Sequence, residues 1–124
     1  MSTAIKDDAL YIDDMLDEIG NITDFTSGIG KEEFLKNTMA KRAVERSIQI
    51  IGEAAKALSE DFKGRHPEIE WRKIIAMRNF ITHAYGEVDH ETVWEVVRHD
   101  IPELKQKLLE GLDRDSLSPR INGK

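Results

Sequence analysis

The segment from Thr38 to Ser59 constrains the fold most strongly, because apolar and small residues recur along it on two adjacent helical seams. Two such seams form a wide face that must contact more than one neighbour. Small residues on this face would let another helix approach closely. We therefore expect a helix at the centre of a bundle, with Thr38 as its N-cap. The first seam consists of Val44, Ile48, Ile51, Ala55 and Leu58, and the second of Ala43, Ser47, Ile50, Ala54 and Ala57.

The other periodic segments also follow a spacing near 3.6, and none has a convincing strand pattern. They span roughly residues 4–25, 31–37, 71–85 and 90–112. Gly64, His66 and Pro67 mark a connection in the middle of the chain. These features predict an all-α fold, an up-and-down bundle of four to five helices joined by short links.

The last periodic segment contains a proline. Asp89 is expected to cap its start, and Pro102 should either kink the helix or begin a new segment capped by Asp100. The apolar face continues to Leu112, after which no periodicity remains. We therefore expect residues 1–112 to form one domain and residues 113–124 to form a mobile tail.

Composition excludes several functional classes. The chain has 124 residues, which suits a single domain, and it has no cysteine, so disulfides, thiolate metal sites and cysteine nucleophiles are excluded. No apolar run approaches the ~20 residues needed to span a bilayer, and the N-terminus has no signal-peptide pattern. We expect a soluble, cytoplasmic protein without a membrane partner. Because the net charge is −6, any binding of nucleic acid must use a local basic patch.

The stretch from Arg78 to Tyr85 combines three groups suited to phosphate chemistry. Arg78 offers a planar fork of donors that matches phosphate oxygens. His83 can give and take protons near neutral pH, and Tyr85 carries a hydroxyl that can stack, donate or be modified. The competing interpretation is that all three are solvated or hydrogen-bonded residues of an ordinary helix.

Helix geometry limits how these groups can meet. Arg78 and Tyr85 are seven residues apart and share a face, whereas Arg78 and His83 project about 140° from each other. Either the helix loosens towards Gly86, or a second subunit supplies the opposite wall of a cleft. A two-fold pair would bring two copies of Arg78 and His83 to one positive groove. Four further cations could extend this groove or simply be solvated: Arg42, Arg46, Arg72 and Lys73.

Other candidates have weaker support. Glu53 could pair with Arg78 or Arg46, most simply as a structural ion pair. His66, His90 and His99 lack metal-ligand spacing with acidic partners, so we expect neither a metal nor another cofactor.

The motif and its flanking strings resemble the HEPN domain family, and within it the HepT-like toxins. The family motif is R-x-x-x-x-H-x-Y, often with a polar residue directly after the arginine, and Arg78, Asn79, His83 and Tyr85 meet every position. The resemblance covers roughly residues 5–112. The flanking strings that resemble the family are IIGEAA at 50–55, PEIEW at 67–71, VWEVV at 93–97 and DIPEL at 100–104.

This resemblance implies a homodimer whose motifs face each other and cleave RNA without a metal. His83 would act as general base or acid, Arg78 would stabilise the transition-state charge, and Asn79 would hold Arg78 or a phosphate oxygen. The resemblance also implies a type VII-like toxin–antitoxin pair. Its antitoxin would be a minimal nucleotidyltransferase that silences the toxin by transferring AMP to Tyr85.

Two other functions remain open at the level of sequence. The chain could be a non-catalytic helical module that binds a nucleotide or docks onto a nucleotidyltransferase, with Arg78 only gripping phosphate. It could also be a purely structural dimer.

Overall fold

The computed structural model describes residues 2–82 and 88–115, and every regular element within them is helical. The predicted all-α fold is therefore confirmed, while the homodimer stays a prediction because the structure is that of one chain. The elements are α1 (Ser2–Thr26), α2 (Lys31–Lys36), α3 (Thr38–Ala57), α4 (Glu60–Arg65), α5 (Trp71–Thr82), α6 (His90–Glu95), a π-helical segment (Val96–Asp100) and α7 (Ile101–Arg114).

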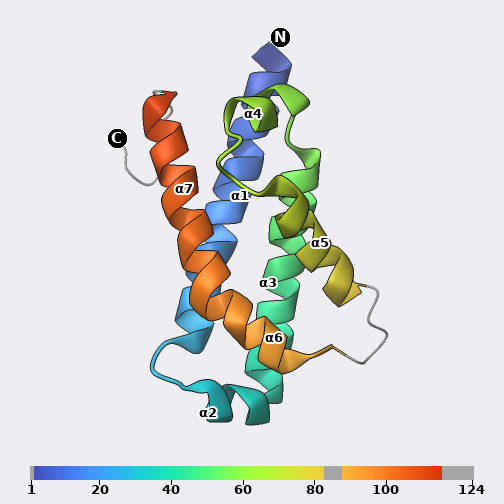
Figure 1. Ribbon diagram of the computed structural model, residues 1–124, viewed down its shortest axis with the longest axis vertical. Helices are drawn as coiled ribbons and strands as arrows, with labels where there is room; N and C mark the ends of the chain where they lie inside the picture. The colour runs from blue at the N-terminus through green and yellow to red at the C-terminus, as the bar shows by residue number, and fades with distance from the viewer. Residues whose placement is uncertain (1, 83–87, 116–124) are drawn as a thin grey trace.

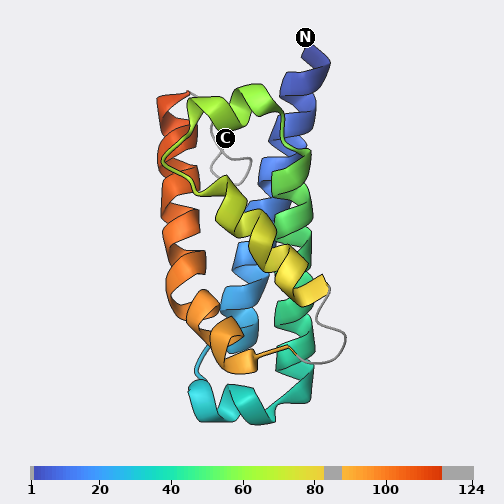
Figure 2. The same cartoon turned by 45° about the vertical axis from the view of Figure 1, so that its right-hand side comes forward.

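The long helices run up and down the molecule (Figure 1). Helix α1 descends, α2 crosses the lower end, and α3 returns to the top, where α4 forms a short cap. Helix α5 then descends obliquely across α3, and the α6–α7 arm climbs beside α1 (Figure 2). Helix α3 packs against α1, α2 and α5, which confirms its predicted central position.

The core lies between these helices, and the first seam of α3 is fully buried in it together with Met15 and Ile19 of α1. The second seam is only partly covered. Ser47 is buried, and its hydroxyl donates to Glu18 Oε1 at 2.8 Å. Ile50 is half-buried and Ala57 is exposed. Helix α3 thus has a side that its own chain leaves partly open.

Two helix starts differ from the expectations. The N-cap of α3 is Asn37 rather than Thr38, because the Asn37 side chain accepts a hydrogen bond from the Ala40 amide at 2.9 Å. Helix α4 was not predicted, because Gly64, His66 and Pro67 indicate a connection in this part of the chain. Ser59 caps it by accepting from the Phe62 amide, while Asp8 of α1 accepts from both the amide and the hydroxyl of Ser59.

The kink expected at Pro102 occurs as a wide turn just before it. Pro102 cannot donate a backbone hydrogen bond, and its ring would clash with the carbonyl one α-turn earlier. The π-helical segment accommodates this loss, with the amide of Ile101 donating to the carbonyl of Val96. A new helix, α7, does begin directly after Asp100, as the alternative predicted, but Asp100 has helical backbone angles and its side chain makes no capping bond.

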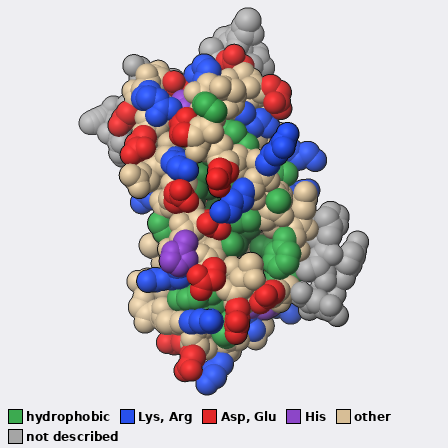
Figure 3. Space-filling view, viewed as in Figure 1, with side chains coloured by type: hydrophobic (Ala, Val, Ile, Leu, Met, Phe, Trp, Pro, Cys, Tyr) green, Lys and Arg blue, Asp and Glu red, His purple; other side chains and the backbone are tan. Residues whose placement is uncertain are grey.

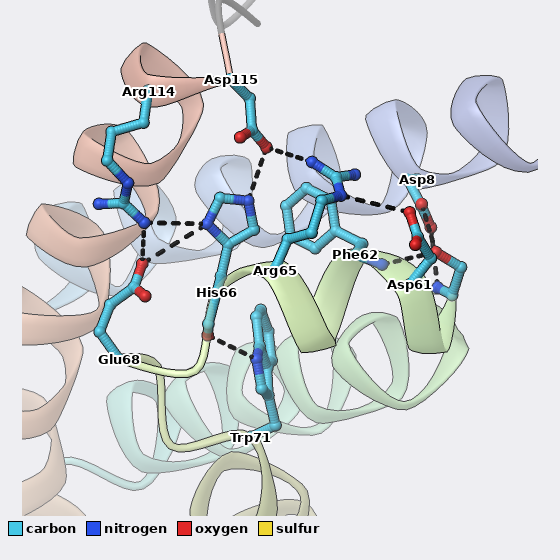
Figure 4. A network of polar contacts seen from close by, with 10 residues as sticks. Asp8, Asp61, Phe62, Arg65, His66, Glu68, Trp71, Arg114 and Asp115 are labelled. Carbon is cyan, nitrogen blue, oxygen red and sulfur yellow. Dashed lines mark hydrogen bonds and ion pairs between the residues drawn. The ribbon is translucent and has the colours of Figure 1, made fainter.

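Helix α7 continues to Arg114, two residues beyond the expected end of the domain, and Asp115 is fixed against α4 (Figure 4). His66, only 1% exposed, lies at the centre of this contact. Arg114 Nη2 approaches His66 Nδ1 at 3.2 Å, and a guanidinium can only donate. Nδ1 also lies 3.5 Å from Glu68 Oε2, and the other ring nitrogen, Nε2, is hydrogen-bonded to Asp115 Oδ2 at 2.6 Å.

Neighbouring groups complete this network. Arg65 Nη1 donates to the same Asp115 oxygen at 2.8 Å, and the indole nitrogen of Trp71 donates to the backbone carbonyl of His66. The hydrogen bond from Arg114 holds the pKa of Glu68 below its ordinary value. A Cβ on Gly111 would lie 2.9 Å from His66 Nδ1, so only glycine lets α7 pass this closely. Residues 116–124, the rest of the predicted tail, lie outside the described ranges.

Replacing Asp115 with alanine should lower the free energy of unfolding by about 1–3 kcal/mol, because the buried His66 Nε2 loses its hydrogen-bond partner. Urea denaturation would measure this loss. Asp113→Ala is the matched control, since Asp113 lies on the same last turn with an exposed side chain and should change stability by less than about 0.5 kcal/mol. Equal effects of the two substitutions would show that the His66 contact contributes nothing.

Candidate functional site

The site is built around the crossing of α3 and α5, where the two helices touch at Gly52 and Arg78. Gly52 is buried, and a Cβ placed on it would lie 2.1 Å from Arg78 Cβ and 2.9 Å from Arg78 Cγ. No real side chain can occupy that space. The missing side chain at Gly52 therefore allows the base of Arg78 to lie directly against the backbone of α3.

The Arg78 guanidinium is held by one hydrogen bond, and not all of its N–H donors have an acceptor in the parts of the chain that the structure describes. Its Nη1 donates to Asn79 Oδ1 at 2.7 Å, which is one of the two contacts expected for Asn79. Its Nε is buried and has no hydrogen-bond partner among the described residues. A buried donor without an acceptor is costly, so a turn of the guanidinium that brings Nε to an acceptor such as a phosphate oxygen would relieve an existing penalty.

His83 and Tyr85 lie outside the described residues. Their predicted convergence with Arg78 in a two-fold groove therefore stays a prediction. Arg78 precedes that segment in the chain and His90 follows it, and the structure describes both.

His90 makes a contact that the sequence did not reveal. Its Nε2 is hydrogen-bonded to Glu45 Oε2 of α3, and the two side chains are 26% and 22% exposed. His90 is the first residue of α6 and follows the cap residue Asp89. Hydrogen bonds from Thr92, through its hydroxyl and its amide, and from the Glu91 amide lower the pKa of Asp89. The start of α6 is thus fixed both by its own cap and by α3.

The cations expected to extend the groove divide into two groups. Lys73 is engaged elsewhere, with its Nζ 3.3 Å from Asp100 and 3.7 Å from Glu70, and the contact with Asp100 raises its pKa. Arg42, Arg46 and Arg72 are exposed, and within the described residues none of them forms an ion pair.

The ion pair expected for Glu53 is absent from the described residues. Its side chain is exposed, and no salt bridge among these residues joins it to Arg46 or Arg78. Arg46 instead donates to Gln49 at 3.4 Å. Arg78 consequently faces no compensating carboxylate in the described part of the chain, which leaves its charge available to an anion.

A separate apolar groove of about 210 Å³ lies between α5 and α6, and apolar side chains gather there on the surface (Figure 3). Phe80, 43% exposed, is one of its walls. Phe80 projects about 160° from Arg78 around α5, so the groove opens on the other side of the helix. It is not part of the Arg78 site. The other apolar walls are Ile48, Ala76, Met77, Ile81, Val93 and Val96.

Residues 2–82 and 88–115 show neither a metal site nor a membrane span. No group of three His, Asp or Glu side chains there could hold a metal ion. None of the helices found there combines the length and apolarity needed to cross a bilayer.

Comparison with known proteins places this arrangement in a family. The family described as "Ribonuclease HepT-like" matches residues 15–110. The chain is 44% identical over 97 residues to "Probable ribonuclease HepT" of Thermococcus cleftensis, covering 78% of this chain and 88% of the relative. It is 35% identical over 118 residues to "Putative RNase MJ1216" of Methanocaldococcus jannaschii, covering 90% and 98%. No solved structure matches. The chain therefore belongs to the HepT-like ribonuclease family.

Proposed function

We propose that the protein is an endoribonuclease toxin in which Arg78 and His83 cleave RNA without a metal, in a groove between two copies of the chain. The observation that carries the proposal is the buried Arg78 Nε, which has no acceptor among the described residues at the α3–α5 crossing. Membership of a family of ribonucleases supplies the reaction class.

The proposed reaction is a transesterification at phosphorus. His83 takes the proton of the ribose 2′-OH, whose oxygen attacks the adjacent phosphorus while the bond to the 5′-oxygen breaks. The partner copy's motif or the same imidazole returns a proton to that leaving oxygen. Arg78 stabilises the additional negative charge on the phosphoryl oxygens. The products are a 2′,3′-cyclic phosphate and a 5′-hydroxyl, so DNA should resist cleavage.

The partly open side of α3 supports the proposed dimer. Ile50 is only half-buried there, and Leu10 of α1 is 57% exposed. Arg46 is exposed on the same helix. A second copy that brought its motif opposite this one would place two cationic motifs near one RNA strand, whereas the chain as a whole, with a net charge of −6, does not attract RNA.

The proposed regulation is AMP transfer to Tyr85 by a partner nucleotidyltransferase. The added phosphate would neutralise the charge of Arg78, and the nucleoside would block the groove. In the alternative function the same partner docks on a non-catalytic dimer, and Arg78 only binds phosphate.

The test is incubation of the unmodified protein with total RNA in EDTA, followed by end-group analysis. Fragments ending in a 2′,3′-cyclic phosphate are expected, and a substrate with 2′-deoxyribose at the mapped position should remain intact. Incubation with the nucleotidyltransferase and ATP should add AMP mass to the wild type but not to Tyr85→Phe. Absence of cleavage by both modified and unmodified protein would refute the nuclease and favour the binding module.

A further inference from the structure

Helix α3 fixes both flanks of the segment that carries His83 and Tyr85. On the N-terminal flank, Arg78 lies against Gly52 of α3 with no space for a side chain between them. On the C-terminal flank, His90 is paired with Glu45 of the same helix. The two anchors are seven residues apart on α3.

Because both anchors lie on α3, the distance between them is fixed by the geometry of that helix. Residues seven apart lie two turns away, about 10.5 Å along the axis, and point in nearly the same direction. Gly52 and Glu45 therefore lie on the same side of α3, where Gly52 contacts α5 and Glu45 contacts the start of α6. The contacts with Gly52 and Glu45 therefore fix how far apart Arg78 and His90 lie.

The Glu45–His90 pair has few competing partners. The Asp89 carboxylate next to it is engaged by Thr92 and the Glu91 amide, and Glu91 itself lies 3.9 Å from Lys31. The side chains of the pair are about three-quarters removed from solvent. A charge-assisted hydrogen bond at such a site has a defined geometry, which exposed surface pairs rarely hold.

We propose that Glu45 and His90 are positioning residues, which hold the segment of His83 and Tyr85 in register with Arg78. The pair touches no substrate in this proposal. It acts by setting where the chain re-enters the bundle after the motif. The consequence for cleavage rests on the proposed function, whereas the consequence for the segment itself does not.

The kinetic test uses Glu45→Ala, His90→Ala, the double variant and the conservative Glu45→Gln, which can still accept from His90. Loss of register should lower the single-turnover cleavage rate about 10- to 100-fold at saturating RNA, with RNA affinity changed less than about twofold. The double variant should be no slower than the slower single variant, because the residues act as one unit. Glu45→Gln should recover most of the rate.

Asp115→Ala is the matched control. It also breaks a histidine–carboxylate contact, that of the buried His66, but at the opposite end of the bundle, so it should lose stability without losing rate. Additive rate losses in the double variant, or an equal loss in Asp115→Ala, would overturn the positioning role.

A second measurement separates this proposal from the nuclease itself. Amide hydrogen exchange in residues 83–87 should be at least about tenfold faster in Glu45→Ala than in the wild type, and unchanged in Asp115→Ala. This result would support the anchor even if the wild type cleaved no RNA. Unchanged exchange in Glu45→Ala would overturn it whatever the cleavage assay shows.

Discussion

Replacing Arg78 with lysine is expected to slow RNA cleavage about 10²- to 10³-fold, the usual cost of removing one donor aimed at transition-state charge. Lysine keeps the positive charge and the Cβ and Cγ that lie against Gly52. It removes the buried Nε–H and the planar fork that grips Asn79 and, by our proposal, the phosphoryl oxygens. Single-turnover cleavage of a defined RNA would measure the loss.

Arg72→Lys is the control for this substitution, because Arg72 is an exposed arginine of the same helix. It should leave the rate within about twofold of the wild type. RNA affinity of Arg78→Lys at low salt should fall far less than its rate, since the charge that dominates phosphate binding remains. A rate loss below tenfold in Arg78→Lys would mean that only the charge at this position matters, and the proposed role of the guanidinium would be wrong.

The long helices could be predicted from the sequence because periodicity reports burial directly. Each buried residue of the first seam of α3 recurs where one side of a 3.6-residue helix must face a core, and all five are buried. The same logic located α1, α5 and the α6–α7 arm. It overestimated the burial of the second seam, because small residues such as Ala57 recur with the same period whether they are covered or exposed.

Features fixed by contacts between distant residues could not be predicted. Helix α4 depends on Asp8, fifty-one residues before the Ser59 that it holds. The partner of Lys73 is Asp100, whose position next to Pro102 suggested a helix cap instead. His66 reads as part of a polar connection, yet it is almost fully buried because α7 passes it at Gly111. No local pattern encodes which distant group satisfies such a side chain.

In the candidate site, too, local features could be predicted from the sequence, whereas contacts between distant residues could not. Arg78 and Asn79 were predicted from the motif, and the structure places them together. The small residues of α3 predicted a close helix approach but not that Arg78 makes it at Gly52. The Glu45–His90 pair joins residues forty-five positions apart, and its only local signal was a histidine beside a helix cap.

Replacing Gly52 with alanine is expected to destabilise the protein by a net of about 1–2 kcal/mol, although alanine is the better helix former. The new Cβ would lie 2.1 Å from Arg78 Cβ, and neither atom is the movable end of a side chain. Helices α3 and α5 must separate, and such overpacking costs about 1–3 kcal/mol and occasionally more. The gain of about 1 kcal/mol in helix propensity offsets only part of this cost. Urea denaturation would measure the net loss.

Gly20→Ala is the matched control, because Gly20 lies in α1 and a Cβ there would meet nothing within 4 Å. It should raise stability by about 0.5–1 kcal/mol, so two glycine-to-alanine changes in two helices should have opposite signs. Gly52→Ala should also slow cleavage about 10²-fold in the folded fraction, since displacing Arg78 by about 1 Å misaligns the proposed catalytic group. If Gly52→Ala were instead as stable and as active as Gly20→Ala, the close contact of Arg78 with α3 could not be what positions it.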